Sequence, residues 1–205
     1  YINGLPDKFK NKIEISSPFI RKQYYEKKFK ENNNEIFTIM IVGGSQGAQI
    51  FDEIIHESIV KISKIKPLKI IHQTSQKKVN FFKKFYSENN VENIVFNFDN
   101  NLDMLISQSD LCITRAGASS LAEIALLNVP FIAIPLPTSK DNHQFENANY
   151  YRDKDCCWII NQKSFDRQKF QSLLLDILKN KDDLTKKKKN LENLNYQNTW
   201  NNVNQ

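Results

Sequence analysis

The fold class of this chain is decided by the stretch Ile39-Met40-Ile41-Val42-Gly43-Gly44-Ser45-Gln46-Gly47-Ala48. An apolar, β-branched run ends at a pair of glycines, and the pattern then changes to helical spacing. This order predicts a strand, a tight glycine loop and a helix N-terminus, which together bind phosphate groups. Glycine lets an anion approach the main chain, and the first amides of a helix have no partners within it. We therefore expect this loop to bind a phosphorylated ligand, above all a nucleotide.

Short apolar runs alternate with helical patterns from residue 35 onward. The predicted strands cover residues 37–42, 68–73, 93–97, 111–114, 131–134 and 156–160. The predicted helices cover residues 48–63, 79–89, 102–108, 119–127, 144–152, 166–179 and 184–204. This alternation predicts an α/β, Rossmann-like fold, a parallel sheet with helices on both faces. Ligands of such sheets bind beyond the carboxyl ends of the strands.

The pattern also divides the chain into three segments. Residues 1–34 are polar and irregular, and we interpret them as an interdomain linker with the end of a preceding domain. Residues 35–180 form the Rossmann-like domain, and residues 181–205 form a C-terminal helical tail. The chain begins at Tyr1 rather than Met and stops within a polar tract, so we expect it to be a piece of a longer protein.

Charge and cysteine content narrow the cellular setting. The net charge is +6 at pH 7, but the lysines are scattered, which favours a solvated surface. Contact with an anionic membrane surface is the alternative interpretation. The three cysteines have no zinc-site spacing and indicate a reducing compartment, and Cys112 lies in an apolar run typical of core. No apolar run is long enough to span a bilayer.

A second strand-to-helix junction of small residues reads Thr114-Arg115-Ala116-Gly117-Ala118-Ser119-Ser120-Leu121-Ala122-Glu123. Two such loops in one sheet predict a diphosphate and a sugar lying across neighbouring strand ends. Glu123 follows the two serines by one helical turn, where its carboxylate is able to accept both hydroxyls of a ribose. The same residues fit the capping box Ser-x-x-Glu, which requires no ligand. The sequence leaves both interpretations open.

A third polar segment, Asp141-Asn142-His143-Gln144-Phe145-Glu146-Asn147-Ala148, follows a predicted strand and opens a helix. Its Asp, His and Gln side chains are within reach of a sugar, and an ordinary helix cap is the alternative. His72-Gln73 ends another predicted strand and would face the same crevice, although a single histidine there is more often structural. The pair Tyr24-Tyr25 and the scattered phenylalanines are more typical of core than of a base-stacking platform.

Taken together, these segments resemble the MurG family, whose members transfer N-acetylglucosamine from UDP-N-acetylglucosamine to lipid I and so make lipid II for peptidoglycan. The resemblance covers about residues 16–180. It rests on residues 43–48, 72–73, 115–118, Glu123 and 141–148. It implies an inverting, UDP-N-acetylglucosamine-dependent hexosyltransferase of glycosyltransferase family 28. The GT-B fold of that family has two Rossmann-like domains, and this chain resembles the C-terminal, donor-binding one.

The resemblance also implies roles for residues near the nucleotide. Ser45 and Gln46 would contact the UDP phosphates. The backbone of Asp99 would contact the uracil. A run of three small residues would line the diphosphate: Ala118, Ser119 and Ser120.

Further roles concern the two sugars and the hinge. Glu123 would hold the ribose hydroxyls, and His143 and Gln144 would bond the hydroxyls of N-acetylglucosamine. Arg21 would be the basic residue that follows the Gly-Asn-Pro of the family's interdomain hinge. Here that segment reads Ser16-Ser17-Pro18-Phe19-Ile20-Arg21, without the glycine and asparagine.

The resemblance implies no metal and no other cofactor in the donor site. It places the general base in the N-terminal domain, so no catalytic residue is assigned in this chain, which alone would bind the donor without turnover. The implied partners are UDP-N-acetylglucosamine, the lipid-linked muramyl-pentapeptide acceptor and the anionic inner-membrane surface, with no nucleic acid. The expected location is the cytoplasmic face of the bacterial inner membrane, as a peripheral protein of cell-wall synthesis, cell shape and division.

Two other functions compete with this one. A nucleotide-sugar-binding subunit would act with a separate acceptor-binding subunit, although a natural subunit would start with Met rather than Tyr1. A dinucleotide-dependent oxidoreductase would bind NAD, but no acidic residue closes the second predicted strand to hold its ribose.

Overall fold

The computed structural model describes residues 20–26, 36–43 and 50–194. Its six strands form one parallel sheet in the order β3-β2-β1-β4-β5-β6. Their bounds are β1 Phe37–Val42, β2 Leu68–Gln73, β3 Glu92–Phe96, β4 Leu111–Thr114, β5 Phe131–Ala133 and β6 Cys157–Ile159. The strand order reverses between β1 and β4. The carboxyl ends of these two strands are therefore the topological switch point, where open α/β sheets bind their ligands.

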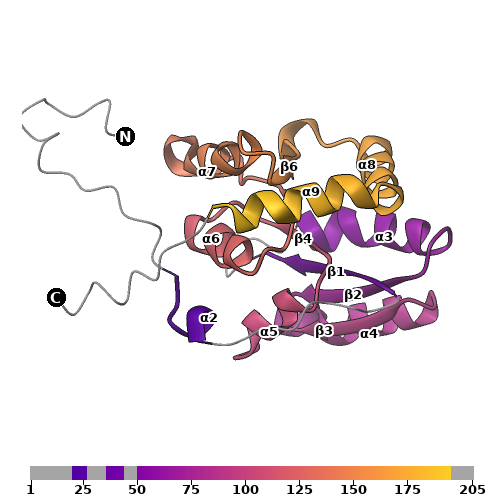
Figure 1. Ribbon diagram of the computed structural model, residues 1–205. Helices are drawn as coiled ribbons and strands as arrows, with labels where there is room; N and C mark the ends of the chain where they lie inside the picture. The colour runs from indigo at the N-terminus through magenta and orange to yellow at the C-terminus, as the bar shows by residue number, and fades with distance from the viewer. Residues whose placement is uncertain (1–19, 27–35, 44–49, 195–205) are drawn as a thin grey trace, which may run out of the picture.

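Helices cover both faces of the sheet (Figure 1). They are α2 Gln23–Glu26, α3 His56–Ser63, α4 Val79–Glu88, α5 Leu102–Ser107, α6 Ala118–Leu126, α7 His143–Arg152, α8 Arg167–Lys179 and α9 Lys181–Glu192. Shorter turns are the π-helical η2 Phe51–Ile55 and the 3₁₀ turns η3 Gln76–Lys78, η4 Lys140–Asn142 and η5 Gln162–Ser164.

The two faces of β1 show how the sequence builds a core on each side. Ile39 and Ile41 are fully buried in the apolar layer that includes α3, α4 and α8. Met40 and Val42 point the other way, into the layer that includes α2, α6, α7 and α9. Successive side chains of a strand alternate between faces, so an uninterrupted apolar run is what a strand covered on both sides requires.

All six predicted strands are confirmed, three of them with the predicted bounds and the others to within one residue at each end. The helix predicted over residues 184–204 differs at both ends. It begins at Lys181, because the side chain of Asn180 accepts a hydrogen bond of 3.1 Å from the amide of Asp183 and caps it. It ends at Glu192, directly after the buried Leu191. Residues 195–205 lie outside the described part.

Helix α9 belongs to the packed body of the domain. It lies against α6 and α8, and Leu191 is buried in the core. The ammonium of Lys187 is buried, pairs with Asp155 and lies 4.6 Å from the ring centroid of Trp158. The first half of the predicted tail therefore packs on the sheet domain.

Two sequence expectations about the core are also confirmed. Cys112 and Tyr24 are both buried. The adjacent Cys156 and Cys157 are free, and burial raises the pKa of the Cys157 thiol to about 12. A thiol with this pKa stays protonated at neutral pH and is therefore a poor nucleophile.

Candidate functional site

The first turn of α6 is open at the switch point. Gly117 occupies the N-cap position with extended backbone, and the helix begins at Ala118, where no side chain of the described residues caps it. Ser119 is exposed. The capping-box alternative is wrong, because Ser120 and Glu123 both lie inside the helix. The first amides of α6 are thus available to an anion.

Nothing in the described protein requires glycine at position 117. Its φ is −67° and its ψ is 134°, a conformation that any residue adopts. A Cβ added there would have its nearest described neighbour 3.8 Å away, at Ser120 Oγ. The position is therefore open above the backbone, as a site of close ligand approach would be.

Glu123 and Arg21, which the sequence treats separately, form a two-pronged ion pair. Arg21 Nε donates to Glu123 Oε1 at 2.6 Å and Arg21 Nη2 donates to Oε2 at 2.9 Å. Arg21 Nη2 also donates to the hydroxyl of Tyr24 at 2.7 Å. The hydrogen bond to Glu123 is the main reason that the pKa of Arg21 is raised.

This pair leaves room for a ligand on Glu123. Glu123 is 6% exposed, whereas the side chain of Arg21 is about half exposed. A carboxylate offers about four lone-pair positions, and the guanidinium uses two of them. The hydroxyl of Tyr24 is a further partner of Glu123, so about one lone-pair position stays open to a ligand hydroxyl.

The start of α7 ties two strand-end loops together. Gln144 Oε1 accepts from the amide of Leu136, after β5, at 3.0 Å, and from the amide of Ala116, after β4, at 3.4 Å. Asn147 Nδ2 donates to the carbonyl of Ala116 at 3.0 Å. The loops after β4 and β5 are thus held beside the first turn of α7.

His143 has a defined free nitrogen. Its Nδ1 lies 2.7 Å from the carbonyl oxygen of Lys140, which is able only to accept, so Nδ1 carries the proton. In the neutral ring, Nε2 is then an acceptor on an exposed side chain. Gln144 differs, because its oxygen is already bonded and its amide nitrogen is the group left for a ligand.

Three further predicted residues lie in the loops after β1 and β3. Ser45 and Gln46 lie outside the described residues. Asp99 follows β3, an edge strand of the sheet, and its Oδ1 accepts from the amide of Asn101 at 2.7 Å. Its neighbour Phe98 is 75% exposed. A ring exposed at a strand end was missed, because the sequence treats the phenylalanines as core.

His72 does not face the crevice. It is fully buried, with Nδ1 3.1 Å from the hydroxyl of Tyr86 and Nε2 3.4 Å from Asp52 Oδ1. Burial lowers its pKa, and the hydrogen bond to Asp52 opposes this only in part. The expectation that it lines the crevice is wrong, and the more common structural role of such a histidine holds.

Asp52 is a further buried acid that no sequence motif indicated. It lies in η2 and accepts from Thr74 Oγ1 at 2.9 and 3.1 Å and from Lys78 Nζ at 3.1 Å. Burial alone would raise its pKa, but the hydrogen bonds from His72, Lys78 and Thr74 outweigh burial and lower it. These contacts fasten η2, which follows the glycine loop in the chain, to the end of β2.

Arg115, at the end of β4, braces the sheet. It is buried, and its Nη1 donates to the carbonyl of Ile134 at 3.0 Å and to Gln162 Oε1 at 2.6 Å. Its guanidinium carbon lies 5.4 Å from the ring centroid of Phe51. The side chain therefore joins the ends of β4 and β5 to η5, which is a structural role.

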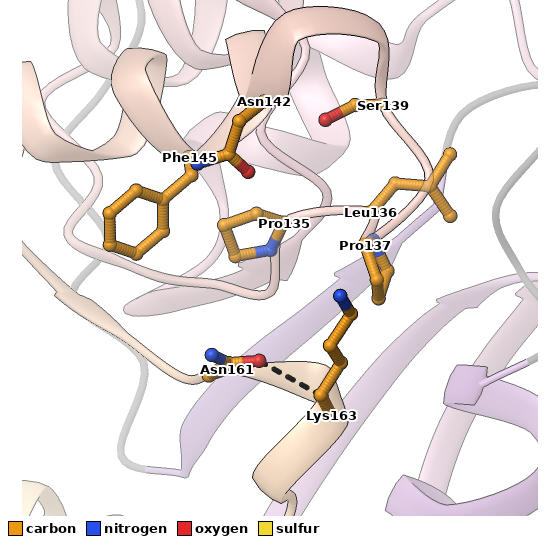
Figure 2. Close-up of a pocket in the computed structure, with 8 residues that line it drawn as sticks. All are labelled: Pro135, Leu136, Pro137, Ser139, Asn142, Phe145, Asn161 and Lys163. Carbon is orange, nitrogen blue, oxygen red and sulfur yellow. Dashed lines mark hydrogen bonds between the residues drawn. The ribbon is translucent and has the colours of Figure 1, made fainter.

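A pocket of about 550 Å³ opens at the same rim, between the loop after β5 and the turn after β6 (Figure 2). Its lining is Pro135, Leu136, Pro137, Ser139, Asn142, Phe145, Asn161 and Lys163. Within the described ranges, no three His, Cys, Asp or Glu side chains are grouped as for a metal ion. No helix of that part is long and apolar enough to cross a membrane.

Comparison with known proteins agrees with this geometry. The glycosyltransferase family 28 C-terminal domain matches residues 38–199. The "UDP-N-acetylglucosamine--N-acetylmuramyl-(pentapeptide) pyrophosphoryl-undecaprenol N-acetylglucosamine transferase" of Pelagibacter ubique (strain HTCC1062) is 43% identical over 203 residues, which are 99% of this chain and 57% of that protein. The protein of the same name from Rickettsia felis is 33% identical and covers 87% of this chain and 53% of its own length.

A solved structure supports the same grouping. The crystal structure of Acinetobacter baumannii MurG is 28% identical, with a TM-score of 0.74 over 85% of this chain and 52% of that one. The chain therefore spans about half the length of the curated relatives that it matches.

Proposed function

The chain belongs to glycosyltransferase family 28, whose C-terminal domain it contains, and we propose that this domain binds UDP-N-acetylglucosamine as a sugar donor. In the proposed reaction, N-acetylglucosamine passes to a lipid-linked muramyl-pentapeptide, which converts lipid I to lipid II. The names of the relatives describe such a transferase. Because the chain spans about half of their length, the acceptor and the general base would be held by another domain.

One observation carries the proposal. The open N-terminus of α6 lies at the switch point of the sheet, beside a loop that Gln144 fastens to the start of α7. A nucleotide sugar needs both an anion site and hydroxyl-binding groups within the length of one ligand. The convergence of α6 and α7 supplies these two kinds of group side by side.

The diphosphate would lie against the first turn of α6. There the amides of residues 118–120 and the helix dipole favour negative charge. Ser45 and Gln46, in the glycine loop, would contact the same phosphates. Glu123 would accept the ribose hydroxyls, and the backbone of Asp99 would meet the uracil.

The transferred sugar would lie toward α7. His143 Nε2 would accept a hydroxyl of N-acetylglucosamine, and the amide nitrogen of Gln144 would donate to another. In an inverting transfer, the acceptor oxygen bonds to the anomeric carbon as the bond to the UDP oxygen breaks. The acceptor's proton passes to a base outside this chain. This domain would orient the donor and stabilise the charge that grows on the leaving diphosphate.

The proposed location follows from the proposed acceptor. The relatives' name includes undecaprenol, a lipid, so a domain acting on such an acceptor works at a membrane surface. A chain with net charge +6 is attracted to anionic lipid. We therefore propose a peripheral position on the cytoplasmic face of the bacterial inner membrane.

Calorimetry on this chain with UDP-N-acetylglucosamine, UDP-glucose and NAD tests the function. We expect UDP-N-acetylglucosamine to bind more tightly than UDP-glucose, and NAD not to bind. Gly117→Ala should weaken the first ligand about tenfold, because a Cβ would meet the diphosphate, while stability rises by about 0.5 kcal/mol. Preferential binding of NAD, or donor binding unchanged by this variant, would contradict the proposal.

A further inference from the structure

The pocket beside α7 has walls from two strand ends. One wall is the loop after β5, continued by Asn142 and Phe145, and the other is Asn161 with Lys163 after β6. Both loops leave the carboxyl end of a parallel strand, so the pocket opens at the rim that holds the proposed donor site. Its volume of about 550 Å³ falls within the usual range of small-molecule sites, about 300–1,000 Å³.

Several hydrogen-bonding groups of this pocket have no protein partner. Ser139 Oγ is buried and has no hydrogen-bond partner among the described residues. No carboxylate of the described chain pairs with the ammonium of Lys163, which crosses from η5 toward the Pro135–Pro137 wall (Figure 2). Asn161 uses its Oδ1 to accept from the amide of Lys163 at 2.9 Å, so its amide nitrogen stays available.

The charge and apolar surface of the pocket define the ligand that fits it. None of the eight lining residues is acidic, one is cationic, and two prolines, Leu136 and Phe145 supply apolar surface. Asp141, next to the wall, is exposed to solvent. A single flexible lysine with neutral donors suits a singly charged carboxylate. Phosphate sites more often use arginine forks or helix N-termini.

We propose that this pocket binds the carboxyl end of the peptide carried by the acceptor, with Lys163 and Ser139 holding the carboxylate. This inference rests on the proposed function, in which the acceptor is a muramyl-pentapeptide. The sugar whose hydroxyl attacks would be held by the other domain, but its peptide leaves the reaction centre beside the donor. Five extended residues span about 16 Å, so the carboxyl end of the peptide is able to reach a pocket at the same rim. Asn142 of the pocket wall directly precedes His143 and Gln144 of the proposed sugar site.

The test is an NMR titration of the ¹⁵N-labelled 205-residue chain, with UDP at saturation. The probe is soluble muramyl-pentapeptide without lipid. Matched titrations use the same peptide with a C-terminal amide, and inorganic phosphate. We expect the free acid to shift the amide signals around Ser139, Asn142 and Lys163, and the C-terminal amide to bind about fivefold more weakly, because it lacks the charge that Lys163 pairs with.

Variants then test the two side chains. Lys163→Gln should weaken the free acid about fivefold and remove its advantage over the amide, whereas Lys163→Arg should keep most of the affinity. Ser139→Ala should weaken it about threefold. The matched control is Lys169→Gln, which removes one positive charge from the exposed face of nearby α8 and should leave binding unchanged.

The possible outcomes distinguish failure of the pocket assignment from failure of the proposed donor-binding function. If UDP-N-acetylglucosamine binds but the peptide does not shift these signals, the pocket assignment is wrong and the donor function stands. Equal binding of acid and amide, or equal loss in the Lys163 and Lys169 variants, also overturns it. Binding of phosphate alone at the pocket would make it a general anion site and reject the peptide. If neither UDP-N-acetylglucosamine nor the peptide binds, both proposals fail.

Discussion

Asp52 and Glu123 are both buried acidic residues, each 6% exposed, but their partners differ in kind. Asp52 is surrounded by groups of the sheet domain itself, two of which, His72 and Thr74, are buried with it. Glu123 has as its main partner a half-exposed arginine from the segment ahead of the sheet. Burial alone therefore does not separate a structural acid from a ligand-binding one.

The two carboxylates differ in how many acceptor positions their protein partners leave free. Asp52 faces His72, Thr74 and Lys78, and the fold supplies all three. Glu123 lies one turn inside an uncapped helix, and its carboxylate keeps lone pairs beyond those that Arg21 uses. Removing Asp52 should thus act on stability, and removing Glu123 should act on donor binding.

The largest effect is expected for Asp52→Ala. The substitution leaves His72, Thr74 and Lys78 without their shared acceptor, so the free energy of unfolding should fall by about 3 kcal/mol. Urea unfolding followed by circular dichroism measures it. Asp52→Asn, which keeps one acceptor oxygen, should lose less. If Asp52→Ala unfolds at the same urea concentration as the parent chain, the structural role is wrong.

Glu123→Ala should instead lower donor affinity strongly and stability only slightly. We expect the affinity for UDP-N-acetylglucosamine to fall about 30-fold, or about 2 kcal/mol, because the ribose loses a charged acceptor. Stability should change by less than about 1 kcal/mol, since the released Arg21 is free to move into solvent. The control is Glu57→Ala, which removes another arginine–glutamate pair, with Arg167, on the far side of the sheet. Calorimetry that finds both variants alike would remove Glu123 from the donor site.

The variant Arg21→Ala shows whether Arg21 helps Glu123 to bind the donor or competes with the donor for its carboxylate. If Arg21 orients the carboxylate for the ribose, its loss should weaken UDP-N-acetylglucosamine binding about fivefold. Tighter binding in this variant would mean instead that Arg21 and the ribose compete for the same oxygens. Arg167→Ala, which breaks the pair with Glu57, is the matched control and should bind the donor as the parent chain does.

Acidification should destabilise the folded chain through the histidine of the Asp52 network. The pKa of His72 is lowered in the folded state, so between that value and the ordinary 6.5 the unfolded chain binds more protons. The free energy of unfolding should therefore fall as the pH is lowered from 7.5 to 5.5. His56, whose pKa burial also lowers, adds to this fall. His72→Gln should remove part of the dependence, and an unchanged slope would exclude His72 as its source.

The sequence was most informative where local pattern decides structure. Most of the strands are buried on both faces and are therefore short, nearly continuous apolar runs. Such runs are recognisable in the sequence alone. Gln144 was found through its segment, although its tie to the loops after β4 and β5 was not. The pairing of Arg21 with Glu123 joins positions 102 residues apart, and no local pattern carries that information.

Other contacts also join residues that are far apart in the sequence, so they became known only from the three-dimensional arrangement. Asp52 follows the glycine loop with no motif of its own, and it meets Thr74 only because β1 and β2 are neighbours. Ser139 and Lys163 come from loops after different strands and share a pocket because β5 and β6 pair in parallel. The capping-box interpretation of α6 was excluded only by where that helix starts, at Ala118.

The clasp between Arg21 and Glu123 has a mechanical consequence. The segment that carries Arg21 precedes the sheet in the chain, and Glu123 belongs to α6. Together with the buried Ile20 and Tyr24, the guanidinium of Arg21 joins this segment to the helix that is proposed to hold the nucleotide. A ligand that strengthens or weakens this ion pair would change how firmly residues 20–26 are held. By thermodynamic reciprocity, a displacement of that segment would change the affinity for the ligand by the same factor.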